Sequence, residues 1–108
     1  MKKRVAVTGG NGFIGKKIIQ ELLKDGHKVI SLQRTSKNLG GIETRHFDLT
    51  NAKSITRKML SDIDVVIHTA ALVHNFKADE NAHRTLNFEA TKRLFKVCEE
   101  AEVEKFVF

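Results

Sequence analysis

Four glycines within seven residues, from Gly9 to Gly15, are the part of this chain whose type and spacing could do chemistry. They follow the apolar run Val5–Val7 and precede a segment with helical spacing. A glycine turn at a helix start presents free backbone N–H groups and the positive end of the helix dipole, and both favour a phosphate. The expected phosphate-binding residues are Thr8, Gly9, Gly10, Asn11, Gly12, Phe13, Ile14 and Gly15.

The spacing of these glycines has a steric reason. Gly10 to Gly15 fit the pattern G-x-G-x-x-G between a strand and a helix, which is the context that a dinucleotide-binding turn requires. A side chain at Gly9 or Gly12 would hold the backbone away from a diphosphate, and one at Gly15 would push the helix off the strand. The alternative is a glycine-rich turn without a ligand.

Apolar strands and amphipathic helices must alternate along the chain to position this turn. Helices are expected over Gly12–Asp25, with Gly26 as its cap, from Asn51 or Ser54 through Leu60, and over Asp79–Ala101. In the last of these, Phe88, Thr91, Leu94, Phe95 and Cys98 share one side. The expected strands are Arg4–Thr8, Lys28–Gln33, Glu43–Phe47, Asp64–Thr69 and Lys105–Phe108. This order predicts an α/β fold: a Rossmann-type, doubly wound parallel sheet of about five strands in three α/β/α layers.

Length and composition agree with one small domain spanning residues 1–108, since the chain contains no proline and no linker. The formal charge of +6 is better explained by phosphorylated small molecules than by nucleic acid, because the basic residues are scattered and not interleaved with aromatic ones. No apolar run is long enough to span a membrane, and the single cysteine, Cys98, fits a reducing compartment, so we expect a cytoplasmic protein. The histidines show no metal-ligand spacing, so no metal is expected.

Five segments in order resemble the extended short-chain dehydrogenase/reductase family, the NAD(P)-dependent epimerase/dehydratase group. Residues 8–15 fit its pattern T-G-x-x-G-x-x-G. The other matching segments are Asp48-Leu49, His68-Thr69-Ala70-Ala71, Asn87-Phe88-Glu89-Ala90-Thr91, with Ala90 in place of the family's glycine, and Glu104–Phe108. The resemblance covers nearly the whole chain.

The resemblance implies roles for several residues outside the glycine turn. Asp48 and Leu49 correspond to the family's adenine-contacting pair, although Asp48 could instead cap the next helix. Small residues after the fourth strand would let the backbone approach the nicotinamide ribose, or would simply pack; they are Thr69, Ala70 and Ala71. Asn87 corresponds to an asparagine that helps to hold the site together, with a surface position as the alternative. His68 is expected to be a hydrogen-bonded structural residue.

The end of the second strand usually selects the cofactor. An acidic residue there would bind the ribose hydroxyls of NAD and repel a 2′-phosphate. This chain has Gln33 and Arg34 instead, and Arg34, helped by Lys37, could pair with that phosphate. We therefore expect NADP(H) in preference to NAD(H). In the alternative, Arg34 is a solvated loop residue and Gln33 binds a ribose hydroxyl.

The catalytic signature of the family, Tyr-x-x-x-Lys, is missing because the chain contains no tyrosine. The expectation is an N-terminal part of a longer enzyme that moves a hydride between NADP(H) and a sugar nucleotide or a ketone or alcohol, with this chain alone inactive. The competing hypothesis is a non-catalytic regulatory protein that senses the dinucleotide. The final strand would present an open edge, so the isolated chain is also expected to pair with a second copy, as a homodimer.

Overall fold

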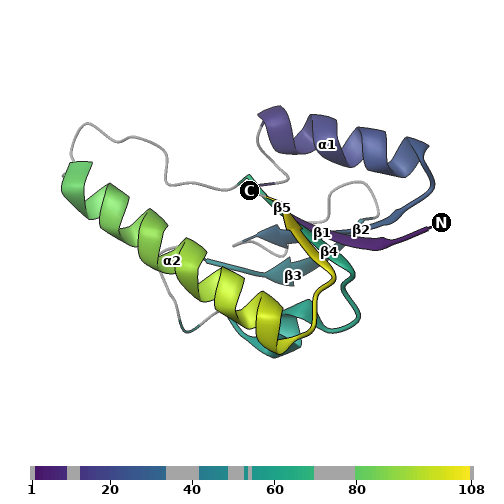
Figure 1. Cartoon of the computed structure of the whole chain (residues 1–108). Helices are drawn as coiled ribbons and strands as arrows, with labels where there is room; N and C mark the ends of the chain where they lie inside the picture. Colours follow the sequence, from purple (N-terminus) through teal and green to yellow (C-terminus); the bar gives the residue numbers. More distant parts are fainter. Residues whose placement is uncertain are drawn as a thin grey trace.

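A computed structural model describes residues 2–9, 13–33, 42–48, 53, 55–69 and 80–107, with the side chains of the last segment described from Phe88. Five parallel strands form one sheet in the order β3-β2-β1-β4-β5 (Figure 1). The strands are β1 (Arg4–Thr8), β2 (Lys28–Gln33), β3 (Glu43–His46), β4 (Val65–His68) and β5 (Lys105–Val107). The helices are α1 (Phe13–Lys24), α2 (Glu80–Glu100) and the short 3-10 helix η2 (Arg57–Leu60). The predicted α/β class, strand number and parallel pairing are confirmed.

The sheet separates two apolar layers because successive side chains of a strand point to opposite faces. Val5 and Val7 of β1 pack with Ile19 of α1, whereas Ala6 packs on the other face with α2 and η2. Figure 1 shows α1 and α2 on opposite sides of the sheet. The central strands are therefore buried on both faces, which explains why their sequences are nearly continuous apolar runs.

Helix α1 ends at Lys24, one residue before its predicted end, and Gly26 forms its cap as predicted. Gly26 has φ +81°, a left-handed conformation that glycine adopts without steric cost. Its N–H donates to the carbonyl oxygen of Leu23 at 3.0 Å, and the N–H of His27 donates to that of Leu22 at 3.1 Å. These bonds satisfy carbonyl groups that the helix end would otherwise leave open. The chain then enters β2 two residues after the glycine.

The predicted apolar side of α2 is partly wrong. Phe88 and Phe95 are 64% and 50% exposed. From Phe88 onward, the predicted residues Leu94 and Cys98 are buried, together with Ala90 and Val97, which the prediction did not include. The stripe is rotated because α2 packs over η2 as well as over the strands, and small and branched side chains fit that double contact. Phe95 still stacks edge-on against Phe106 of β5, with ring centroids 5.7 Å apart.

The helix expected from Asn51 or Ser54 through Leu60 is also corrected. The 3-10 helix η2 forms the end of this segment, and Thr56, which precedes it, is extended with φ −131° and ψ 160°. Asn51 and Ser54 lie outside the described residues, so their predicted capping role is not addressed. Ile55, Met59 and Leu60 are all buried. A tight 3-10 turn brings these apolar side chains onto the sheet and α2 within a few residues.

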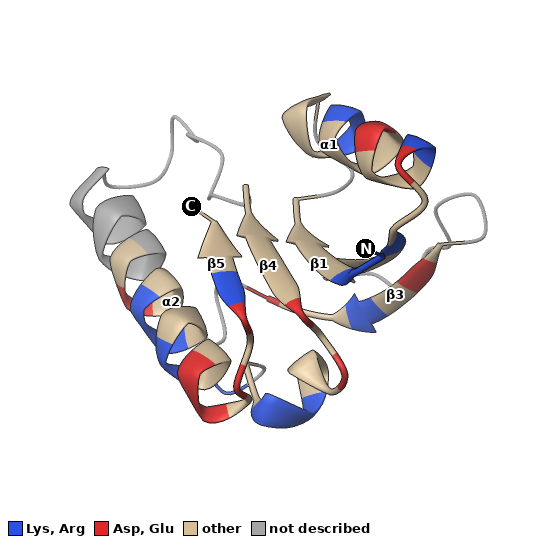
Figure 2. Ribbon diagram, turned by 45° about the vertical axis from the view of Figure 1, so that its right-hand side comes forward, with Lys and Arg blue, Asp and Glu red and all other residues tan. Residues whose placement is uncertain are grey.

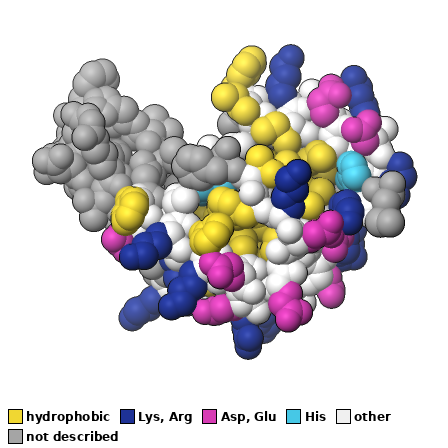
Figure 3. Space-filling view, viewed as in Figure 1, with side chains coloured by type: hydrophobic (Ala, Val, Ile, Leu, Met, Phe, Trp, Pro, Cys, Tyr) yellow, Lys and Arg dark blue, Asp and Glu magenta, His cyan; other side chains and the backbone are white. Residues whose placement is uncertain are grey.

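The two faces of the sheet are not covered equally. Helix α1 lies over β1 and β2, and the α1 face of β4 and β5 has no other helix among the described residues. Val107 of β5 is 39% exposed there, and Val65 and Ile67 are only partly buried. Figure 3 shows hydrophobic side chains gathered on this face between the two helices. Within the described part of the chain, no helix is long and apolar enough to cross a membrane.

Candidate dinucleotide site

The carboxyl ends of the parallel strands meet at one edge of the sheet. β1 lies between β2 and β4, so that Thr8 is paired in register with Leu32 on one side and with His68 on the other. The chain leaves β1 toward α1 on one face, and it leaves β4 toward α2 on the opposite face. Crevices in doubly wound sheets form where successive connections diverge in this way, outside the carboxyl ends of the strands. The β1–β4 boundary is therefore the expected ligand site.

The start of the glycine turn has the backbone geometry that such a site needs. Gly9 directly follows β1 and has φ +69°, in the left-handed region. The turn ends at α1, in which Gly15 is buried, whereas Phe13 and Ile14 are 82% and 64% exposed. The predicted residues Gly10, Asn11 and Gly12 lie outside the described residues.

A hydrogen-bond network ties the ends of β1 and β4 together. The Thr8 hydroxyl oxygen accepts the backbone N–H of Thr69 at 2.9 Å and lies 2.8 Å from Nδ1 of His68. The Thr69 hydroxyl donates to the carbonyl oxygen of Thr8. His68 reaches Thr91 of α2 through Nε2, at 3.1 Å. The prediction that His68 is a hydrogen-bonded structural residue is confirmed. Thr8 and Thr69 are joined by two hydrogen bonds.

The end of β2 carries a second polar contact. The Ser31 hydroxyl donates to Oε1 of Gln33 at 3.0 Å, and both side chains are buried. This contact fixes the Gln33 amide at the strand end where a ribose is expected to bind. Arg34 and Lys37 lie outside the described residues, so the structure does not address their predicted contact with a phosphate.

The remaining candidate residues are distributed around the same edge. Asp48 is half-buried, two residues beyond the end of β3. Asn87 lies in α2, one helical turn before Thr91, and its side chain is outside the described residues. Leu49, Ala70 and Ala71 are also outside them. The structure therefore brings Thr8, Gly9, Gln33, Asp48 and Thr69 to one edge of the sheet.

The last side chains of β1, β2 and β4 are Thr8, Gln33 and His68, and none of them is charged. Burial lowers the pKa of His68, which keeps its ring neutral. In Figure 2 the blue and red segments of β1, β4 and β5 lie toward their amino ends, whereas the carboxyl ends of these strands are tan. Attraction of an anion to this part of the edge then depends on backbone N–H groups and the α1 dipole.

Cys98 and the histidines offer no competing chemistry within the described part of the chain. Burial raises the pKa of the Cys98 thiol to about 11, so it behaves as a small apolar residue, as the sequence predicts. His27 is engaged structurally, since its Nδ1 accepts the N–H of Lys3 at 3.0 Å. Among the described residues, no three histidine, cysteine or acidic side chains are grouped to hold a metal ion.

Sequence reasoning did not identify two residues of this edge as part of the site. Ser31 is a polar residue within an otherwise apolar strand, and that contrast was a usable signal. Thr91 was assigned to the side of a helix and to the segment that resembles the family motif, but to no role in the site, and its contact with His68 spans 23 residues of sequence. No local pattern reports such a contact, because it depends on how α2 packs against β4.

Known proteins that this chain resembles include dehydrogenases and epimerases. The chain is 33% identical to a 3-beta-hydroxysteroid dehydrogenase of Mycolicibacterium neoaurum, over 97% of its own length and 31% of that protein. Its structure resembles a UDP-N-acetylglucosamine 4-epimerase from Bacillus cereus (TM-score 0.77, 29% identity, 94% of this chain and 33% of that one). It also resembles a short-chain dehydrogenase/reductase superfamily protein from Agrobacterium tumefaciens with bound NAD (TM-score 0.81, 25% identity, 97% and 31%).

The chain thus spans about a third of the length of the relatives it matches. A sequence profile of one family matches nearly all of it, residues 5–108. That match includes the glycine turn, the β1–β4 boundary and α2 in the order that the structure shows. On this match and on its sheet topology, the chain belongs to the NAD-dependent epimerase/dehydratase family.

Proposed function

We propose that this chain binds a nicotinamide dinucleotide across the carboxyl ends of β1, β2 and β4. The observation that carries the proposal is the position of Gly9, which turns the chain with φ +69° where β1 adjoins β4. The diphosphate would lie against backbone N–H groups of residues 9–15, at the start of α1. The structural relative with bound NAD supports the same class of ligand.

The proposed contacts follow the strand ends. Asp48 and Leu49 would receive the adenine, and Thr69, Ala70 and Ala71 would border the nicotinamide ribose. Asn87 would support this region from α2. Support comes from the described positions of Asp48 and Thr69 at the carboxyl edge, and from the family motifs that these residues match.

For the whole protein we propose hydride transfer between the nicotinamide and a substrate carbon, with residues 1–108 acting as the cofactor-binding domain. The bound dinucleotide supplies the redox chemistry, and the chain's own residues hold it in place. The relatives named above suggest sterols or other ketones and alcohols, or sugar nucleotides, as substrates. The chain alone would be inactive because it contains no tyrosine to act as proton donor. A dinucleotide sensor without turnover is the alternative. Three assays of the whole protein separate the two: NADPH oxidation with ketones, NADP+ reduction with alcohols, and product analysis with sugar nucleotides, whose epimerisation leaves the cofactor without net change.

The cofactor preference is tested by titrating NADPH and NADH separately into the folded chain. We expect NADPH to bind about tenfold more tightly, because a charge-assisted contact from Arg34 to the 2′-phosphate contributes about 1.5 to 3 kcal/mol. Arg34→Glu should abolish this preference. Lys96→Glu makes the same change of charge on the exposed side of α2 and should preserve it. Equal or tighter binding of NADH by the unmodified chain contradicts the assignment of Arg34.

A second copy of the chain is the partner proposed for the open edge of β5. Among the described strands, β5 is at the edge of the sheet beside β4; Val107 of β5 is 39% exposed, and Phe95 of α2 is 50% exposed. The opposite edge strand, β3, carries Glu43 and Arg45, which form an ion pair at 2.8 Å and discourage strand addition. Light scattering should therefore show dimers of the isolated chain at high concentration. A monomer over the whole concentration range contradicts this pairing.

A further inference from the structure

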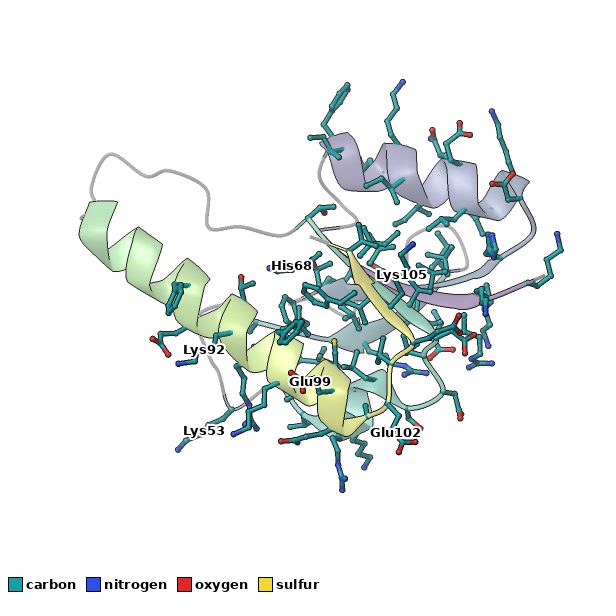
Figure 4. All side chains as sticks on the ribbon, viewed as in Figure 1. Lys53, His68, Lys92, Glu99, Glu102 and Lys105 are labelled. Atoms are coloured by element: carbon teal, nitrogen blue, oxygen red, sulfur yellow. The ribbon has the colours of Figure 1, made fainter. Side chains whose placement is uncertain are left out.

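The His68 side chain joins three elements that are distant in sequence. One ring nitrogen, Nδ1, lies 2.8 Å from the Thr8 hydroxyl of β1, and the other, Nε2, lies 3.1 Å from the Thr91 hydroxyl of α2. These partners are 60 and 23 residues away along the chain. Figure 4 shows His68 between the sheet and α2. A single ring thus spans the space between the turn that follows β1 and the helix that follows β4.

The ring itself is held by two aromatic neighbours. Phe47, just beyond β3, meets it edge-on with centroids 6.4 Å apart, and Phe106 of β5 lies at 6.2 Å. His68 is 7% exposed, and burial lowers its pKa. A neutral imidazole has one donor and one acceptor nitrogen, and each threonine hydroxyl can take either role. The ring can therefore keep both hydrogen bonds without a charged partner.

The contact with Thr8 extends to the ligand-binding turn. The Thr8 oxygen that faces His68 also accepts the N–H of Thr69, so the ends of β1 and β4 share one hydroxyl. Gly9 follows Thr8 directly, and Ala70 and Ala71 follow Thr69. The orientation of Thr8 therefore sets where the chain enters the glycine turn relative to where it leaves β4.

We infer that His68 is a positioning residue for the dinucleotide, acting through Thr8 and Thr91 to hold the glycine turn, the end of β4 and helix α2 in one fixed arrangement. This inference rests on the proposed function. A dinucleotide must contact the turn with its diphosphate and the residues after β4 with its nicotinamide half at the same time. Holding both regions in the bound arrangement beforehand avoids the entropic cost of ordering them during binding.

The test compares a whole dinucleotide with ADP, which carries the diphosphate but no nicotinamide half. Thr91→Val keeps the shape of the side chain and removes its hydroxyl, whereas Thr91→Ser keeps the hydroxyl. In Thr91→Val the Kd of NADPH should rise about tenfold, the loss expected for one buried hydrogen bond. The Kd of ADP should change less than twofold. Thr91→Ser should bind both ligands within twofold of the unmodified chain.

A matched control separates positioning from general loss of stability. Val97→Ala opens a cavity in the same face of α2, since Val97 is fully buried, but does not touch the His68 network. It should lower the denaturation midpoint and leave the Kd of NADPH within twofold. Equal weakening of NADPH binding by Val97→Ala and Thr91→Val would overturn the inference, as would unchanged binding by Thr91→Val or an equal loss for ADP.

A measurement on the unmodified chain covers the case in which Thr91→Val does not fold. Exchange of the Thr69 amide hydrogen reports the bond to the Thr8 hydroxyl directly. Saturating NADPH should slow this exchange at least tenfold more than saturating ADP does, and equal protection by the two ligands would overturn the inference. Failure of the proposed function is seen separately, because the unmodified chain would then bind neither NADPH nor NADH.

Discussion

Replacing Gly9 with alanine is expected to weaken dinucleotide binding by one to two orders of magnitude. Gly9 has φ +69°, and a left-handed conformation costs a residue with a Cβ about 1 to 2 kcal/mol. The chain would relax by turning the peptide groups of the glycine turn, and the new methyl group would face the diphosphate. Losing one charge-assisted bond to a phosphate removes about 1.5 to 3 kcal/mol of binding free energy. Fluorescence titration with NADPH and NADH measures the change in Kd.

Gly26→Ala is the matched control for this substitution. Gly26 has φ +81°, so its replacement carries the same kind of backbone cost at the other end of α1. An added Cβ would also come within 2.5 Å of the Lys2 side-chain nitrogen, the movable end of a flexible chain. Both variants should lose about 1 to 2 kcal/mol of stability, and only Gly9→Ala should lose affinity. If the two variants bound NADPH equally well, the glycine turn would not be the diphosphate site.

Truncating Leu94 to alanine is expected to have the largest effect on stability. Leu94 is fully buried where α2 packs over η2 and the sheet. Removing such a side chain costs about 2 to 5 kcal/mol, through lost burial and the cavity that remains. A domain of this size has about 5 to 15 kcal/mol in total, so the variant would lose a large part of its stability. Urea denaturation monitored by circular dichroism gives the difference, provided that the slope of the transition is unchanged.

Lys96→Ala provides the comparison on the same helix. Lys96 is exposed, and surface substitutions of this kind usually change stability by less than about 0.5 kcal/mol. The contrast between neighbouring positions checks that the face of α2 with Leu94 is the buried one. A loss below about 1 kcal/mol for Leu94→Ala would show that α2 is not held by this face.

The proposed cofactor site lies at the carboxyl edge of the sheet, at the ends of β1, β2 and β4. The described edge is uncharged apart from Asp48, and its polar groups bond mainly to one another. Such an arrangement is typical of a rigid cofactor-binding site. In the proposed enzyme, the bound dinucleotide would supply the redox chemistry. A dinucleotide sensor would use the same binding site without turnover.

The succession of strands and helices along the chain and the glycine turn were predictable because local sequence patterns indicate both. Apolar runs of strand length alternate with helical periodicity, and parallel connections have one preferred hand, which restricts the sheet to few topologies. The position of Gly9 after β1 follows from the sequence in the same way, since glycine is the residue that tolerates the required φ. β3 ends one residue before its predicted end, β4 is one residue shorter than predicted at each end, and β5 begins at Lys105 as predicted.

The tertiary structure decided the contacts between residues that are far apart in the chain. Periodicity placed Leu94 and Cys98 correctly on the buried side of α2, but Ala90 and Val97 are buried beside them where Phe88 and Phe95 were expected. The joint contact of His68 with Thr8 and Thr91 likewise has no local signature. The sequence by itself therefore determined the order of the elements along the chain and the position of the glycine turn. Which side chains hold that turn in place depended on the close fit of α2, β1 and β4, because a hydrogen bond needs its atoms placed within a few tenths of an ångström.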